Sequence, residues 1–176
     1  MRLFFAICLN QEIKDKIYNR VASLKEACVD GRFSRKENLH LTLSFLGEVS
    51  PARLDELKKV LESVPFNSLE LEFSEIGKFG RGREAIYWIG IKKNPELYAI
   101  QKTLTDKLKE NGFKPDDKPF KAHITLGRQV IMPDSFSFDS LNSDKVPSMR
   151  VDKISLMLSD RVNGALTYTE LFNNKN

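Results

Sequence analysis

Residues 38–47 read NLHLTLSFLG, and residues 121–128 read KAHITLGR. The chain has 176 residues but only two histidines, and each of them opens the same pattern, H-x-T-L. At the threonine and leucine content of this chain, the chance that both histidines are followed in this way is roughly one in 10⁵. We therefore expect the two segments to occupy equivalent positions in two related halves of one fold.

Both segments are predicted to be strands with one face in the core and one face that carries chemistry. Successive side chains in a strand point to opposite sides, so residues two apart share a face. His40 therefore projects with Thr42, and His123 projects with Thr125. The apolar residues expected on the opposite sides are Leu39, Leu41, Leu43 and Phe45 in the first segment and Ala122, Ile124 and Leu126 in the second.

Three other segments repeat apolar residues at steps of three and four, which predicts helices that each cover one side of a sheet. Asparagine or proline precedes each of them, as is typical where helices begin. The helical segments are residues 13–24, 54–64 and 97–108, and the third is expected to stop at Asn111-Gly112.

The remaining apolar segments are predicted to be strands. Residues 69–73 alternate strictly, and residues 85–91 form an apolar run after a turn at residues 80–84. Asn163-Gly164 indicates a hairpin near the end of the chain, and residues 133–147 resemble a surface loop. Hairpins mixed with helical connections favour an α+β fold with antiparallel sheets over a doubly wound one.

Composition excludes few functions. With 41% hydrophobic and 30% charged residues, the chain can bury a core as one unit or as two lobes that share it. The apolar opening, residues 3–9, is expected to be a buried strand, and no stretch reaches the roughly 18 apolar residues of a membrane span. Cys8 and Cys28 have no disulfide-like spacing, which favours a reduced, cytoplasmic location. A net charge of +4 permits a polyanionic partner without requiring one.

Core packing, metal binding and a serine nucleophile each explain the paired histidines less well than acid–base catalysis does. Core packing has no reason to require imidazole plus hydroxyl twice. A metal site needs three or four ligands, and the sequence offers no third ligand beside the histidines. Strand alternation places Ser44 on the face of His40, where it resembles a nucleophile, but Gly127 stands at the matching place in the second segment.

Two imidazoles on either side of one phosphorus atom explain the pattern best. Hydrolysis of a phosphodiester needs a base for the attacking oxygen and an acid for the leaving oxygen, roughly in line. Histidine can do either near neutral pH without a metal. The hydroxyls of Thr42 and Thr125 would then donate to the non-bridging oxygens.

The motifs identify a resemblance that covers nearly the whole chain. It is carried by RLFFAICL, NLHLTLSFLGEV, AIYWIGI, GFKPDDKPFKAHITLGR and LMLSDRVNGALTYTEL. The chain resembles the two-histidine (2H) phosphoesterase superfamily, and within it the RNA 2′,3′-cyclic phosphodiesterases, historically called 2′-5′ RNA ligases. The resemblance implies a bilobal α+β domain over residues 1–176, with motif strands near residues 38–46 and 121–128 in two pseudo-symmetric lobes and a cleft between them.

The resemblance also implies an activity. The expected reaction is hydrolysis of an RNA 2′,3′-cyclic phosphate to a 2′-phosphomonoester, by a monomer without metal, cofactor or protein partner. The substrate would be such an RNA end or a small cyclic nucleotide. His40 would protonate the departing 3′ oxygen and His123 would activate water. Ligation of 2′,5′ bonds by the reverse reaction, or a module that binds RNA ends without turnover, are the alternatives.

Two further residues follow the motifs at matching places. The resemblance assigns Phe45 to stacking on the terminal base and Arg128 to the phosphate. Strict alternation puts both on the core face, so each strand is expected to bend, with Gly47 and Gly127 as the suitable places. Weaker candidates for contact with RNA phosphates, more readily explained as solvated side chains, are Arg81, Arg83, Lys118 and Lys121.

Overall fold

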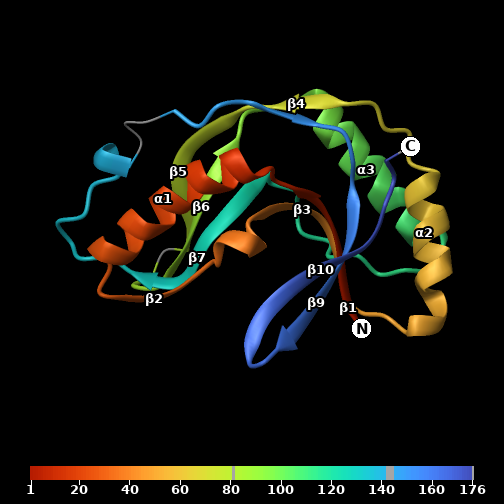
Figure 1. The fold of residues 1–176 in the computed structure, drawn as a ribbon, viewed down its shortest axis with the longest axis horizontal. Coiled ribbons are helices and arrows are strands. Elements are labelled where there is room, and N and C mark those ends of the chain that lie inside the picture. The colour runs from red at the N-terminus through yellow and green to blue at the C-terminus, as the bar shows by residue number, and fades with distance from the viewer. Residues whose placement is uncertain (81, 142–144, 176) are drawn as a thin grey trace.

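Two four-stranded antiparallel sheets form the framework of the protein in a computed structural model, which describes residues 1–80, 82–141 and 145–175 (Figure 1). Sheet A contains, in order, β10 (Ala165–Asn173), β9 (Ser155–Val162), β1 (Arg2–Cys8) and β3 (His40–Glu48). Sheet B contains β2 (Asp30–Phe33), β7 (His123–Ile131), β6 (Ala85–Ile91) and β5 (Phe73–Phe79). A small third sheet pairs β4 (Leu69–Leu71) with β8 (Met149–Val151).

Three α-helices and three short 3₁₀ turns connect the strands. The helices are α1 (Gln11–Ala27), α2 (Leu54–Glu62) and α3 (Pro95–Glu110), and the turns are η1 (Lys36–Asn38), η2 (Pro51–Arg53) and η3 (Asp139–Leu141). The three predicted helices are confirmed. The Asn10 side chain accepts the Ile13 amide at 2.9 Å, and the Asn94 side chain accepts the Leu97 amide at 3.0 Å. Both asparagines therefore cap a helix as predicted.

The chain exchanges helices between the two sheets. α1 follows β1 of sheet A but packs on β2 and β7 of sheet B, whereas α3 follows β6 of sheet B but contacts β3 of sheet A (Figure 1). α2 packs beside α3 and also touches β10. One continuous apolar core runs through both halves. The predicted α+β fold with two related lobes, each with an antiparallel sheet and one motif strand, is confirmed.

The first strand lies inside sheet A, where it pairs with β3 on one side and β9 on the other. Leu3, Phe5 and Ile7 are at most 1% exposed, as expected of a buried strand. The hairpin predicted near the end of the chain is also confirmed. Asn163 and Gly164 have φ angles of 50° and 79°, the left-handed pair that a tight hairpin turn requires.

Two sequence predictions about the chain outside the motifs are wrong in part. Residues 69–73 do not form one strand, because the alternating segment changes partner at Glu72, from β8 before it to β6 after it. Residues 133–147 are not simply a surface loop. The rings of Phe136 and Phe138 lie 6.4 Å and 5.7 Å from the ring of buried Tyr87, and Leu141 is buried as well. Residues 142–144 of this segment lie outside the described residues.

Candidate active site

The two motif strands meet where the sheets adjoin. His40 is the first residue of β3, His123 is the first residue of β7, and these strands contact each other. Burial is the main cause that lowers the pKa of His40, and the positive charges of Arg128 and His123 add to it. The fold therefore brings the two histidines and Arg128 into one electrostatic neighbourhood.

A bulge in β3 changes which side chains share the histidine face. Thr42 pairs with Ala6 of β1, but the next paired residue is Ser44, opposite Phe5. Leu43 is thus an extra residue, and its carbonyl accepts a hydrogen bond from the Gln101 side chain at 3.3 Å. A one-residue insertion of this kind reverses the alternation that follows it.

Phe45 consequently lies on the face of His40. It pairs with Phe4, which projects on the same side of β1 as Ala6 and Cys8, the partners of Thr42 and His40. Phe4 and Phe45 also belong to a small apolar cluster that is separate from the main core. The bulge therefore resolves the conflict between the expected role of Phe45 and simple alternation.

The same irregularity recurs in β7. Thr125 pairs with Trp88 and Gly127 pairs with Tyr87, which leaves Leu126 as the extra residue. Its carbonyl accepts the amide of Ser34 at 2.8 Å. Arg128 is thereby returned to the face of Thr125 and His123. The leucine of each H-x-T-L motif is the bulged residue.

These bulges correct two sequence predictions. The strands were expected to bend at Gly47 and Gly127, and the register of each strand does shift beside that glycine, but a first shift comes earlier, at Leu43 and Leu126, and it is this one that turns Phe45 and Arg128. Ser44 was expected beside His40, whereas it pairs with Phe5 on the core side and is only 6% exposed. A nucleophilic role for Ser44 is therefore ruled out by its position.

Each histidine is oriented by a backbone carbonyl. Nδ1 of His40 lies 2.6 Å from the Asn38 carbonyl oxygen, and Nδ1 of His123 lies 2.6 Å from that of Lys121. A carbonyl only accepts hydrogen bonds, so Nδ1 carries the proton in both rings and Nε2 is the position free for chemistry. Nε2 of His40 is 2.9 Å from the Thr42 hydroxyl.

Aromatic side chains flank both imidazoles. The His40 ring lies 4.9 Å from Phe4 and 5.1 Å from Tyr168, and the His123 ring lies 5.1 Å from Phe79 and 6.3 Å from Trp88. Sequence reasoning missed these neighbours. The glycine at position 77, which pairs with Trp88 across the strands, was one signal for this tryptophan. A Cβ atom at Gly77 would lie only 2.4 Å from the indole ring, so the ring requires glycine there.

The surroundings favour the neutral form of both histidines. Burial is the main cause that lowers the pKa of His40, followed by the charges of Arg128 and His123, while the Asn38 carbonyl opposes them. The pKa of His123 is also lowered, by burial and then by Arg128. A bound anion would offset this positive field and restore a protonated imidazole.

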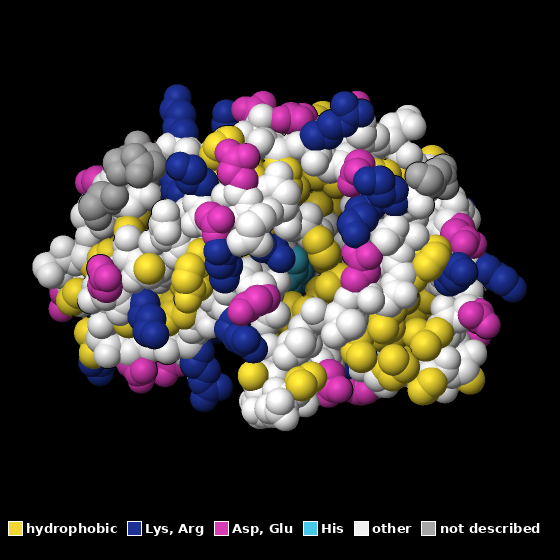
Figure 2. All heavy atoms as spheres, in the orientation of Figure 1, with side chains coloured by type: hydrophobic (Ala, Val, Ile, Leu, Met, Phe, Trp, Pro, Cys, Tyr) yellow, Lys and Arg dark blue, Asp and Glu magenta, His cyan; other side chains and the backbone are white. Residues whose placement is uncertain are grey.

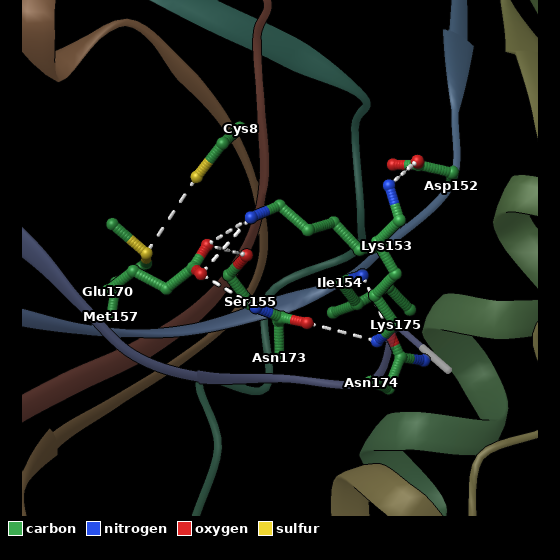
Figure 3. Close-up of polar contacts among 10 residues, drawn as sticks. All are labelled: Cys8, Asp152, Lys153, Ile154, Ser155, Met157, Glu170, Asn173, Asn174 and Lys175. Carbon is green, nitrogen blue, oxygen red and sulfur yellow. Dashed lines mark hydrogen bonds and ion pairs between the residues drawn. The ribbon is translucent and has the colours of Figure 1, made fainter.

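A polar network supports sheet A beyond His40 (Figure 3). Cys8 pairs with His40 across the strands, and its pKa is raised, chiefly by burial. The Glu170 carboxylate accepts hydrogen bonds from three side chains, those of Lys153, Ser155 and Asn173. These bonds join β9 and β10 behind the site.

The space-filling view shows a histidine at the bottom of a hollow in the middle of the face, with lysine and arginine side chains gathered on one side of it (Figure 2). Among the weaker basic candidates, Lys121 lies 5.5 Å above the Phe79 ring, Lys118 pairs with Asp116, and Arg83 is exposed. Arg81 lies outside the described residues.

The described residues contain no group of three or more histidine, cysteine, aspartate or glutamate side chains that could hold a metal ion. No helix in the described part of the chain is long and apolar enough to cross a membrane. Cys8 and Cys28 are both free thiols.

Comparison with known proteins identifies the family. A model of the 2′-5′ RNA ligase superfamily matches residues 13–163. The chain belongs to this superfamily. The RNA 2′,3′-cyclic phosphodiesterase of Archaeoglobus fulgidus is 38% identical over 130 residues, which cover 73% of this chain and 72% of that protein. The Escherichia coli protein of the same name is 32% identical over 178 residues, covering 97% and 93%.

Solved structures of this superfamily agree with the fold. Escherichia coli LigT without ligand superimposes with a TM-score of 0.80 at 29% identity, covering 98% of this chain and 95% of that one. LigT complexed with 3′-AMP gives a TM-score of 0.81 at 30% identity over the same shares. These neighbours are bilobal, as is this superfamily member.

Proposed function

We propose that this chain hydrolyses the 2′,3′-cyclic phosphate at RNA ends to a 2′-phosphomonoester, by acid–base catalysis between two histidines and without a metal ion. Residues 1–176 would act as one bilobal domain with the substrate between the lobes. The observation that carries the proposal is the matched geometry of the motifs. On each strand a carbonyl fixes Nδ1, a threonine follows two residues later, and a bulge adds one further side chain to the same face.

The reaction assigns one role to each Nε2 atom. His123 Nε2 accepts a proton from water, whose oxygen forms the new bond to phosphorus. The bond from phosphorus to the 3′ oxygen breaks as His40 Nε2 donates its proton to that oxygen. The products are a 2′-phosphomonoester and a free 3′ hydroxyl. After the reaction His123 is protonated and His40 is neutral, and proton exchange with solvent restores the starting state.

The surroundings of the two rings support this direction. The hydrogen bond that orients His123 is exposed, whereas the one that orients His40 is partly buried. Water reaches the more exposed imidazole more readily, which suits the proton acceptor. His40 is more enclosed, between Phe4 and Tyr168, and it can act as the donor once the bound phosphate offsets the positive field that helps to lower its pKa.

The remaining residues would hold the phosphate and the base. The Thr42 hydroxyl lies 2.9 Å from His40 Nε2, and it would donate to a non-bridging oxygen once Nε2 carries the proton destined for the 3′ oxygen. Thr125 is placed to do the same from β7, and Arg128 supplies a positive charge. Phe45 would stack on the terminal base, beside the Arg2 guanidinium 5.1 Å from its ring.

Turnover of a 2′,3′-cyclic nucleotide tests the proposal. His40→Gln and His123→Gln should each lower kcat by about 10²- to 10⁴-fold, as expected for loss of a proton-transfer group, and a chelator should leave the rate unchanged. Exposed Arg150→Ala serves as the control. Activity that persists in either histidine variant contradicts the paired mechanism.

Product analysis separates the alternatives. Binding of cyclic-phosphate ends without product would favour a non-catalytic module, and joined oligonucleotides would favour 2′-5′ ligation. Water at about 55 M makes hydrolysis the favoured direction unless two ends are held together.

A further inference from the structure

Two arginines lie directly opposite each other on the site face of sheet B. Arg32 of β2 pairs with Arg128 of β7. The neighbours of Arg32 point the other way, because Phe33 packs on the core and a Cβ atom at Gly31 would meet the buried Val130 side chain at 3.0 Å. Arg32 therefore projects on the same side as Arg128, and both side chains are exposed.

The fold gives no reason for this pair. Like charges directly opposite in a sheet repel each other and weaken the pairing. Some exposed cations in the described part of the chain have carboxylate partners, such as Arg53 with Glu56 and Lys92 with Glu72, and others stand alone without facing a like charge. Within the described ranges, no carboxylate forms an ion pair with Arg32 or Arg128. A bound anion would remove the repulsion and occupy the unused hydrogen-bond donors of both guanidinium groups.

The two arginines stand at different distances from the reaction. Burial is the main cause that lowers the pKa of His40 and His123, and the charge of Arg128 adds to it in both, so Arg128 lies beside the position proposed for the cyclic phosphate. Arg32 belongs to β2, which is an edge strand of sheet B. It is therefore one strand, about 4.8 Å, further from the centre of the site.

We infer that Arg32 binds the internucleotide phosphate adjacent to the cyclic end, so that the preferred substrate is an oligonucleotide and not a mononucleotide. This inference rests on the proposed function and names its substrate class. The RNA chain would run from the histidines across β7 toward β2 at the edge of the sheet. Arg128 would then bind the cyclic phosphate, and Arg32 would bind the phosphate on the 5′ side of the terminal nucleoside.

The experiment compares two substrates, a nucleoside 2′,3′-cyclic phosphate and a dinucleotide that ends in the same group. Arg32→Ala should lower kcat/KM for the dinucleotide by about tenfold, the lower end for a hydrogen bond to a charged group, and leave the mononucleotide unchanged. The slope of log kcat/KM against log salt concentration should fall in magnitude by about 0.7 for the dinucleotide, as for one lost phosphate contact on a single strand. Arg32→Lys should retain part of the effect.

Controls make the outcomes distinct. Arg150→Ala, which removes an exposed arginine on β8, should change neither substrate, and the thermal midpoint of Arg32→Ala should equal or exceed that of the wild type because a repulsion is removed. An equal loss on both substrates, or none on either, overturns the inference. If the wild type turns over neither substrate, the proposed function fails instead. Calorimetric binding of a dinucleotide with a 2′-phosphate end, against the mononucleotide 2′-phosphate, then still tests Arg32.

Discussion

The two bulges make a paired prediction with opposite signs. Gly127 and Ser44 occupy the same place after the bulged leucine in β7 and β3. A Cβ atom at Gly127 would lie 2.8 Å from Val130 Cγ2 and 3.0 Å from Phe33 Cδ1, so Gly127→Ala overfills a packed site. Overpacking of this kind costs about 1–3 kcal/mol. For a chain of this length that lowers the thermal midpoint by roughly 2–4 °C per kcal/mol.

The matched substitution in β3 should have the reverse effect. The Ser44 hydroxyl is buried and has no hydrogen-bond partner among the described residues. Because an unsatisfied buried hydroxyl is unfavourable, Ser44→Ala should be neutral or stabilise by up to about 1 kcal/mol. A Cβ atom is already present there, so the change adds no volume.

Urea unfolding followed by circular dichroism measures both free energies, and kcat/KM on a cyclic nucleotide measures the site. Gly127→Ala should also lower kcat/KM, because the residue lies between Thr125 and Arg128, whereas Ser44→Ala should not. Equal stability of the two variants would refute the claim that the site around Gly127 is packed too closely for a side chain.

Three further predictions concern the histidines and their neighbours. Because burial and the charge of Arg128 lower the pKa of both imidazoles, the pH profile of kcat/KM should be a bell centred below pH 6.5. A bell centred above pH 7 would contradict these lowered pKa values. Since the folded state disfavours protonation of these rings, the free energy of unfolding should fall as pH drops below about 6.5, and a urea series should show a smaller fall in a His40→Gln/His123→Gln double variant. Tyr168→Phe keeps the ring that contacts His40 and should retain activity, whereas Tyr168→Ala should lower kcat; equal rates for the two would exclude a positioning role for the ring.

Periodicity in the sequence predicted the helices, the hairpin and the two motif strands, because each depends on local spacing and on capping or turn residues. It predicted that Leu69, Leu71 and Phe73 share a buried face, and all three are buried. It did not predict that the segment changes its partner strand at Glu72. Alternation reports which side chains are covered. It carries no information about which strand lies alongside.

The candidate site was predictable in its residue types but not in its geometry. The paired motifs indicated His40 and His123, and the resemblance indicated Phe45 and Arg128. A bulge has no local signature when the extra residue is as apolar as its neighbours, so the sequence did not reveal that the motif leucines shift the register. Arg32 was missed because its partner in β7 is distant in the sequence.

The exchange of helices between the sheets has a consequence for how the protein works. β1 leads to α1 on the opposite sheet and β6 leads to α3 on the first, so each motif strand is braced by a helix delivered from the other half. Each half therefore depends on the other for the helix that packs on its motif strand. The relative position of His40 and His123 therefore depends on both halves together, and the proposed substrate would bind where two mutually supported sheets adjoin.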